Sequence, residues 1–190
     1  MAFGFSVAPE GIEDAICDAV SRSNVIFLAA TSNEGLTQDI AYPARWHHLV
    51  LPVFATGIDG WRLHSNPGVP SEWQPFATLG DEVPSASLFG QPSDPHKCTR
   101  TGASVSTVIM ASLVSCILEF VRLRETKNEH GRLKDWKLAK VYKLNGIKRV
   151  LSLMAEKKEN NIYIDPEHLS RLGIDDCKRL ERMREVLIDA

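Results

Sequence analysis

Two short, continuous apolar runs constrain the fold of this chain more than any other feature of its sequence. They are VIFLAA (25–30) and LVLPVFAT (49–56), and neither alternates polar with apolar residues. Strands that are apolar at every position are typical of a parallel sheet covered by helices on both faces. Ahead of the first run, residues 11–23 carry apolar side chains at helical spacing. The order helix, buried strand, loop, buried strand therefore predicts an α/β fold.

Proline and glycine mark where this regular pattern stops. Pro52 interrupts the second run, and because proline cannot donate to a sheet ladder, we expect it at a strand end or edge. Residues 57–103 hold most of the prolines of the chain and are expected to form long surface loops with short strands. The stretch Val105–Val121 is apolar almost all round and contains neither glycine nor proline, which predicts a buried helix.

The composition changes near residue 121, after which Lys, Arg, Glu and Leu dominate. Apolar residues at helical spacing predict helices over Leu138–Lys158 and Asp175–Ile188, with a short strand at NIYIDP between them. We therefore expect two units, a first domain over residues 1–120 and a helical C-terminal extension over residues 121–190.

Charge and cysteine usage exclude several classes of function. Twenty-two basic and 24 acidic residues leave a net charge of −2 in 190 residues, which gives no electrostatic case for nucleic acid or an acidic membrane as a partner. No run of 18 uninterrupted apolar residues and no secretory signal pattern is present, so we expect no membrane partner and a cytoplasmic location. The four cysteines lie too far apart for a zinc site or a disulfide framework. We expect no metal and no cofactor, and Cys17 and Cys116 are interpreted as core residues.

A serine directly ahead of the long apolar helix is the first candidate for chemistry. Gly102 and Ala103 lead into Ser104, which places the hydroxyl at a helix N-terminus. Free N–H groups and the helix dipole there favour the negative charge that develops during acyl transfer. By itself the pattern is more typical of an ordinary N-cap.

An asparagine after the first strand is the second candidate. Asn33 follows VIFLAA, at the edge of an α/β sheet where ligands bind. Its side-chain amide could donate a hydrogen bond to an oxyanion. By itself, Asn-Glu-Gly is more typical of a turn.

Taken in order, four segments resemble the subtilases, the subtilisin-like serine peptidases. They are VIFLAATSNEG (25–35), AYPARWHHLVLPVFATGIDG (41–60), FATLGDEVPSA (76–86) and TGASVSTVIMASLVSCILEF (101–120), and the opening MAFGF is similar to a further strand of that family. The resemblance implies the C-terminal half of a three-layer fold with a mostly parallel sheet, and a serine endopeptidase acting on peptide or protein substrates. It also implies that Ser104 is the nucleophile, Asn33 the oxyanion-hole amide and Gly102 the glycine that makes room for the substrate backbone.

The chain also departs from the family pattern. The Asp and His motifs of the triad are absent, and Asp59-Gly60 is interpreted as a turn. The family's Thr and Pro around the serine are replaced by Ala103 and Val108. A serine hydroxyl needs an adjacent base, so we expect the chain alone to be inactive.

Three interpretations remain open. A missing N-terminal half or a partner chain could supply Asp and His. Alternatively, the chain is a pseudopeptidase or binding module that keeps the cleft, or a helical interaction protein that acts through its tail. In the first case, the missing strands would leave a sheet edge prone to pairing with another chain.

Overall fold

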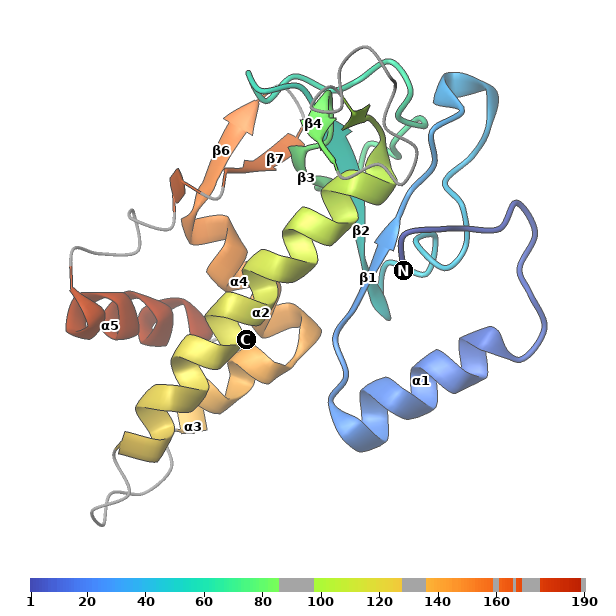
Figure 1. The fold of residues 1–190 in the computed structure, drawn as a ribbon. Coiled ribbons are helices and arrows are strands. Elements are labelled where there is room, and N and C mark those ends of the chain that lie inside the picture. Colours follow the sequence, from blue (N-terminus) through green and yellow to red (C-terminus); the bar gives the residue numbers. More distant parts are fainter. Residues whose placement is uncertain (86–97, 128–135, 159–160, 166, 169–174, 189–190) are drawn as a thin grey trace.

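A five-stranded sheet forms the centre of the molecule in the computed structural model, which describes residues 1–85, 98–127, 136–158, 161–165, 167–168 and 175–188 (Figure 1). The strand order is β1 (Phe27–Ala30), β2 (Val50–Thr56), β3 (Phe76–Leu79), β7 (Asn161–Ile164) and β6 (Ala155–Lys158). The first four strands run parallel, and β6 pairs antiparallel with β7. The prediction of an α/β fold with a mostly parallel sheet is therefore confirmed.

Helices cover both faces of this sheet (Figure 1). One face packs against α2 (Ala103–Lys127) and α4 (Leu144–Leu153). Helix α5 (Asp176–Leu187) packs on α4 and on the short α3 (Trp136–Ala139), which continues into a 3-10 turn over Lys140–Tyr142. The other face packs against α1 (Ile12–Ser23). A 3-10 turn over Gly35–Thr37 follows β1, and β4 (Val83–Pro84) pairs with β5 (Thr99–Arg100) apart from the main sheet.

The continuous apolar run in β2 is explained by these two layers. Leu51 and Val53 face the cluster that contains α2, whereas Val50 and Phe54 face the cluster that contains α1. All seven residues of β2 are buried. Because both faces are covered, both sets of alternate positions are apolar, and the only polar residue of the strand is Thr56 at its end.

The prediction that Pro52 marks a strand end or edge is wrong, since β2 is flanked by β1 and β3 and Pro52 lies inside it. The Val53 carbonyl accepts a hydrogen bond from the Thr31 N–H, so the Val53 main chain faces the β1 side. The Pro52 nitrogen then faces the β3 side, where pairing begins only at Val53 and Phe76. No ladder hydrogen bond is lost there, which is why a proline fits in an interior strand.

Helix α2 is less buried than its composition suggests. Leu113, Val114 and Ile117 pack onto the sheet, but Val108 is 57% exposed. By length and hydropathy alone, the segment Ala103–Arg124 could cross a membrane. In the structure, 39% of its most apolar stretch of 18 residues is buried inside the molecule. Cys116 on this helix and Cys17 on α1 are exposed, so interpreting them as core residues is wrong.

The tail is only partly helical, and the expected helix over Leu138–Lys158 is broken. Lys143 has an extended backbone (φ −113°, ψ 153°) and separates the 3-10 turn from α4. Beyond α4 the chain enters β6, because residues 155–158 pair with β7. The predicted strand at NIYIDP is confirmed by β7, and the predicted last helix is confirmed by α5. Residues beyond 121 thus add two strands to the sheet as well as helices, and the unit boundary near residue 121 stays a prediction.

Candidate functional site

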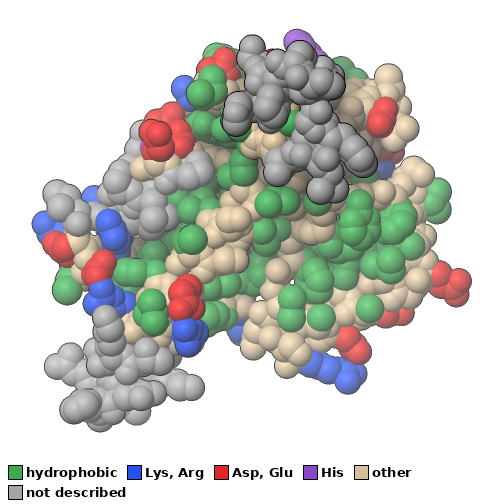
Figure 2. All heavy atoms as spheres, viewed as in Figure 1, with side chains coloured by type: hydrophobic (Ala, Val, Ile, Leu, Met, Phe, Trp, Pro, Cys, Tyr) green, Lys and Arg blue, Asp and Glu red, His purple; other side chains and the backbone are tan. Residues whose placement is uncertain are grey.

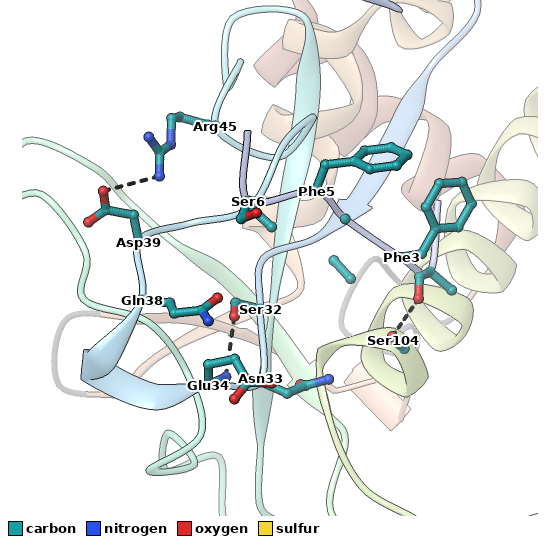
Figure 3. Close-up of a pocket in the computed structure, with 14 residues that line it drawn as sticks. Phe3, Phe5, Ser6, Ser32, Asn33, Glu34, Gln38, Asp39, Arg45 and Ser104 are labelled. Carbon is teal, nitrogen blue, oxygen red and sulfur yellow. Dashed lines mark hydrogen bonds and ion pairs between the residues drawn. The ribbon is translucent and has the colours of Figure 1, made fainter. Parts of the chain in front are cut away.

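The sheet topology brings Ser104 and Asn33 to the borders of one cavity, at the carboxyl ends of the parallel strands (Figure 3). Asn33 lies three residues after β1, and Ser104 is the second residue of α2. The cavity has a volume of about 510 Å³ and is lined by the N-terminal segment 2–6, by residues between 30 and 45, and by Ser104. Two candidates that are 71 positions apart in the sequence thus share one site.

The Asn33 side chain connects the two elements directly. Its Oδ1 accepts a hydrogen bond from the Ala103 N–H at 2.7 Å, so Asn33 caps the first residue of α2 from a distant loop. Figure 3 shows this side chain reaching toward the first turn of the helix. The Asn33 Nδ2 has no acceptor among the described residues, which leaves its two N–H groups available to a ligand oxygen.

Gly102 has a role beyond the one that the family resemblance implies: its backbone conformation and its lack of a side chain both require glycine. Its φ of 132° lies in the region that favours glycine. A Cβ on Gly102 would also stand 2.7 Å from the Asn33 Oδ1. The Gly102 N–H donates to the Gly80 carbonyl at 2.7 Å, which joins the start of α2 to the end of β3. Gly102 therefore allows the Asn33 amide to approach the helix.

A second glycine, Gly80, allows close packing at the same junction between β3 and α2. A Cβ there would lie 2.1 Å from the Ser106 Oγ and 2.9 Å from the Ala55 Cβ. The buried Ser106 hydroxyl donates to the carbonyls of Thr78 and Leu79, at 3.0 and 3.1 Å. The sequence reasoning did not single out Gly80, although it belongs to the FATLG segment that carried part of the resemblance.

The Ser104 hydroxyl is half-buried and hydrogen-bonded to the main chain. Its Oγ donates to the Ala2 carbonyl at 2.5 Å (Figure 3). A peptide carbonyl is far too weak a base to take the proton of a serine. The Ser104 N–H, in the first turn of α2, has no acceptor among the described residues and remains free for an oxyanion.

The charged side chains of the cavity were not anticipated from the sequence. They are Glu34, Asp39 and Arg45. Arg45 pairs with Asp39 at 3.2 Å and donates from its Nε to the Ile40 carbonyl at 2.9 Å. No histidine occurs among the described residues that line the cavity.

Three histidines whose ring contacts are defined, His47, His48 and His168, lie on other parts of the chain. His47 stacks against Trp73 with ring centroids 4.3 Å apart, and the His168 Nδ1 contacts the Met154 carbonyl at 3.1 Å. Over the described part of the chain, no three His, Cys, Asp or Glu side chains gather closely enough to hold a metal ion.

Comparison with known proteins supports the fold assignment. No protein-family model matches the sequence, and no curated protein is significantly similar to it. Solved structures do match. A protease-domain structure of PatA has a TM-score of 0.59 at 21% identity and aligns with 91% of this chain and 57% of its own. The prenylagaramide maturation protease PagA has a TM-score of 0.61 at 20% identity, over 91% of this chain and 61% of its own.

The PatG macrocyclase domain aligns with all of this chain and 51% of its own, with a TM-score of 0.59 at 20% identity. A structure of PatG macrocyclase has also been solved in complex with a peptide. The chain thus spans between about half and three-fifths of the length of these structures. At this identity the similarity establishes the fold alone, an α/β fold that resembles part of the subtilisin-like protease and macrocyclase domains.

Proposed function

We propose that this chain carries the nucleophile and the oxyanion-binding groups of a subtilisin-like serine peptidase that acts on peptide or protein substrates. One observation supports this more than any other: the Ser104 hydroxyl borders the same cavity as two sets of free donors, the Ser104 N–H and the Asn33 amide. Donors held in place for a developing oxyanion supply a large part of the catalysis of acyl transfer.

In the proposed reaction the Ser104 Oγ attacks the carbonyl carbon of a peptide bond while its proton passes to a base. The carbonyl oxygen becomes an oxyanion, which accepts hydrogen bonds from the Asn33 Nδ2 and the Ser104 N–H. Collapse of this intermediate breaks the C–N bond, and the leaving amine takes the proton. Water then hydrolyses the acyl ester on Ser104 and regenerates the hydroxyl.

The base in this reaction is proposed to be a histidine outside these 190 residues. In the structure the Ser104 proton is directed to the Ala2 carbonyl, and the described ionisable groups of the cavity are Glu34, Asp39 and Arg45. Asp39 already pairs with Arg45. Upstream sequence or a partner chain would bring the histidine, and a peptide substrate would then displace the Ala2 carbonyl from Ser104.

The N-terminal segment borders the sheet edge where such a polypeptide would attach. Strand β1 is the edge strand, and Met1 lies beside it: the Met1 carbonyl accepts a hydrogen bond from the Ala30 N–H, and its amino group donates to the Leu28 carbonyl. Phe3 and Val7, in the same segment, are 58% and 76% exposed. Figure 2 shows hydrophobic side chains gathered to one side of α2, over this segment.

Labelling with a fluorophosphonate in the presence of imidazole tests the proposal. Imidazole at high concentration can stand in for the missing base, so we expect slow labelling of the chain alone and faster labelling as imidazole is added. The Ser104→Ala variant should not label, whereas Ser115→Ala, which removes an exposed serine on the same helix, should label normally. Absence of Ser104-dependent labelling at every imidazole concentration would remove the case for a nucleophile.

Substitutions at Asn33 separate its two proposed roles. Asn33→Asp keeps an oxygen to accept from the Ala103 N–H but loses both amide donors. We expect this variant to unfold at about the same urea concentration as the wild type, and to label roughly 10²–10³-fold more slowly. Asn33→Ala should also lose about 1 kcal/mol of stability, because the helix cap is gone. An Asn33→Asp variant that labels at the wild-type rate would exclude the amide as an oxyanion donor.

A peptide-binding module without catalysis is the second candidate function. The Ser104–Ala2 hydrogen bond and the replacement of the family's proline by Val108 favour it, because both fit a site in which the serine no longer reacts. Peptides that bind the cavity with equal affinity in wild type and Ser104→Ala, with no labelling under imidazole, would establish this function instead. The interpretation as a helical interaction protein gains no support from a specific contact.

A further inference from the structure

A second cavity lies at the amino ends of strands β2 and β3. Ser104 lies at the other end of the parallel strands, their carboxyl end. The second cavity has a volume of about 400 Å³ and lies between the segment that precedes β3 and helix α4. In Figure 1, strand β2 starts at the end of the sheet away from the start of α2, where the candidate active site lies. Its volume falls in the range of small-molecule sites, about 300–1,000 Å³.

Apolar and aromatic side chains form one wall of this cavity. Trp73 stacks on His47, with ring centroids 4.3 Å apart and planes inclined by 46°. Pro52 and the buried Phe76 complete the wall from the two strands. A surface of this kind binds an apolar or aromatic group by removing it from water.

Basic side chains of α4 form the facing wall. Lys148 is half-buried, and its Nζ donates to the His47 carbonyl at 3.1 Å. An ammonium has three donors, and no carboxylate pairs with Lys148 among the described residues. Desolvation by the surrounding protein lowers the pKa of Lys148. A cation held in this way is stabilised by an anion that enters the cavity.

The charged side chains around the cavity favour an anion over a cation or a neutral group. Arg149 adds a second positive side chain, and its Nη1 donates to the Val186 carbonyl at 3.2 Å. Glu72 contributes one carboxylate, which accepts from the Ser71 hydroxyl at 3.3 Å. Two cationic side chains outweigh this one carboxylate, so the cavity attracts an anion.

We propose that this cavity binds a carboxylate that carries an apolar side group, with the anion against Lys148 and Arg149 and the apolar group against Trp73 and Phe76. Two sources share this chemistry, a free small carboxylic acid and the C-terminal residue of a peptide. The site is independent of the proposed peptidase function, because it lies at the amino ends of the strands and Ser104 lies at their carboxyl ends.

Titration of the full chain with N-acetyl-phenylalanine and with N-acetyl-phenylalanine amide, followed by NMR, tests the proposal. We expect the acid to shift the Trp73 indole signal and to bind at least tenfold more tightly than the amide. Lys148→Met keeps the length of the side chain and should weaken binding of the acid about tenfold. Lys143→Met, at an exposed lysine just before α4, should leave binding unchanged.

A Phe-terminated pentapeptide with a free or an amidated C-terminus distinguishes the two sources. Tighter binding of the free peptide than of N-acetyl-phenylalanine identifies a peptide C-terminus, and weaker binding identifies a small acid. The Ser104→Ala variant should bind as the wild type does, even if Ser104 proves unreactive. Equal affinity for acid and amide, or unchanged affinity in a folded Lys148→Met variant, would overturn the proposal. Trp73→Ala provides a second check, since it should weaken binding of both the acid and the amide.

Discussion

At Gly102 the backbone adopts φ 132°, and a Cβ would stand 2.7 Å from the Asn33 Oδ1. Gly102→Ala should therefore lower the free energy of unfolding by about 2 kcal/mol or more, through backbone strain and displacement of Asn33. Gly11→Ala should cost only about 1 kcal/mol, because its φ is 73° but nothing lies within 4 Å. Urea unfolding of both variants measures the difference.

Gly68→Ala serves as the matched control for this series. Its nearest contact for an added Cβ is the Leu36 Cδ2 at 3.7 Å, an ordinary van der Waals distance. We expect this variant to be as stable as the wild type or slightly more stable. If Gly102→Ala behaves in the same way, Asn33 does not need the space that the glycine provides.

Tyr163 in β7 gives the stability a pH dependence in the alkaline range. Its burial, with the nearby negative charge of Asp165, raises the pKa of Tyr163 to about 12. In the unfolded chain a tyrosine ionises near pH 10. Between these values the unfolded state loses the proton and the folded state keeps it, so the free energy of unfolding falls as the pH rises from about 10 to about 12.

Comparing wild type with Tyr163→Phe isolates this contribution. The variant has no phenol at position 163, so its free energy of unfolding should fall less over that pH window. Tyr42→Phe, which retains Tyr163, should follow the wild type. Urea unfolding at several pH values provides the measurement, and parallel curves for wild type and Tyr163→Phe would show that Tyr163 does not cause the loss.

At the scale of single elements, helix α5 begins at a capping aspartate. The Asp175 carboxylate accepts from the Lys178 N–H at 2.9 Å, and Asp176 adds negative charge to the first turn. Asp175→Ala should lower the free energy of unfolding by about 1 kcal/mol, whereas Asp175→Asn should retain most of the capping energy. Glu181→Ala, on the exposed side of the same helix, should change it little. Thermal or urea unfolding that ranks Asp175→Ala with Glu181→Ala would contradict this role.

The sequence predicted a helix or strand where neighbouring residues cause it, and not where a distant segment does. Helices α1 and α5 and strands β1 and β7 follow from periodicity, buried runs and an N-terminal aspartate, all of which are properties of neighbouring residues. The sequence pattern predicted one continuous helix over Leu138–Lys158 and so did not predict the break at Lys143 or the strand β6. A Cβ at Gly146 would stand 2.0 Å from the Lys140 carbonyl, so the chain turns sharply there, and β6 exists because β7 pairs with it. Neither cause produces a signal in hydrophobic periodicity.

The exposed face of the N-terminal segment predicts behaviour at the scale of the whole molecule. Val7 and Val108 are 76% and 57% exposed, and β1 presents the sheet edge on the side of this segment. We expect the isolated chain to associate as its concentration rises. Replacing Val7 and Val108 together by aspartate should shift the chain toward the monomer in light scattering. Ile58→Asp, in the exposed turn after β2, should not change the distribution, and a wild-type chain that stays monomeric would contradict the prediction.

The core extends across the composition change near residue 121. Leu51 and Val53 of β2 belong to the same buried cluster as Val150 and Leu151 of α4. Local composition distinguishes the two parts of the chain, but it does not report which apolar faces meet. Described residues after 121 therefore contribute to the same core as β2, although their sequence resembles an appended set of helices.

The sequence by itself determined the α/β class and the buried strands, because these depend on residue type and on short-range spacing. It also gave Ser104 and Asn33 as candidates, and the resemblance to the subtilases added Gly102. Only the tertiary structure decided that Asn33 caps α2, that the Ser104 proton points to the Ala2 carbonyl, and that Pro52 fits inside the sheet. Each of these depends on which main-chain groups from distant segments face one another. Strand pairing and helix packing set that arrangement, and no local pattern encodes it.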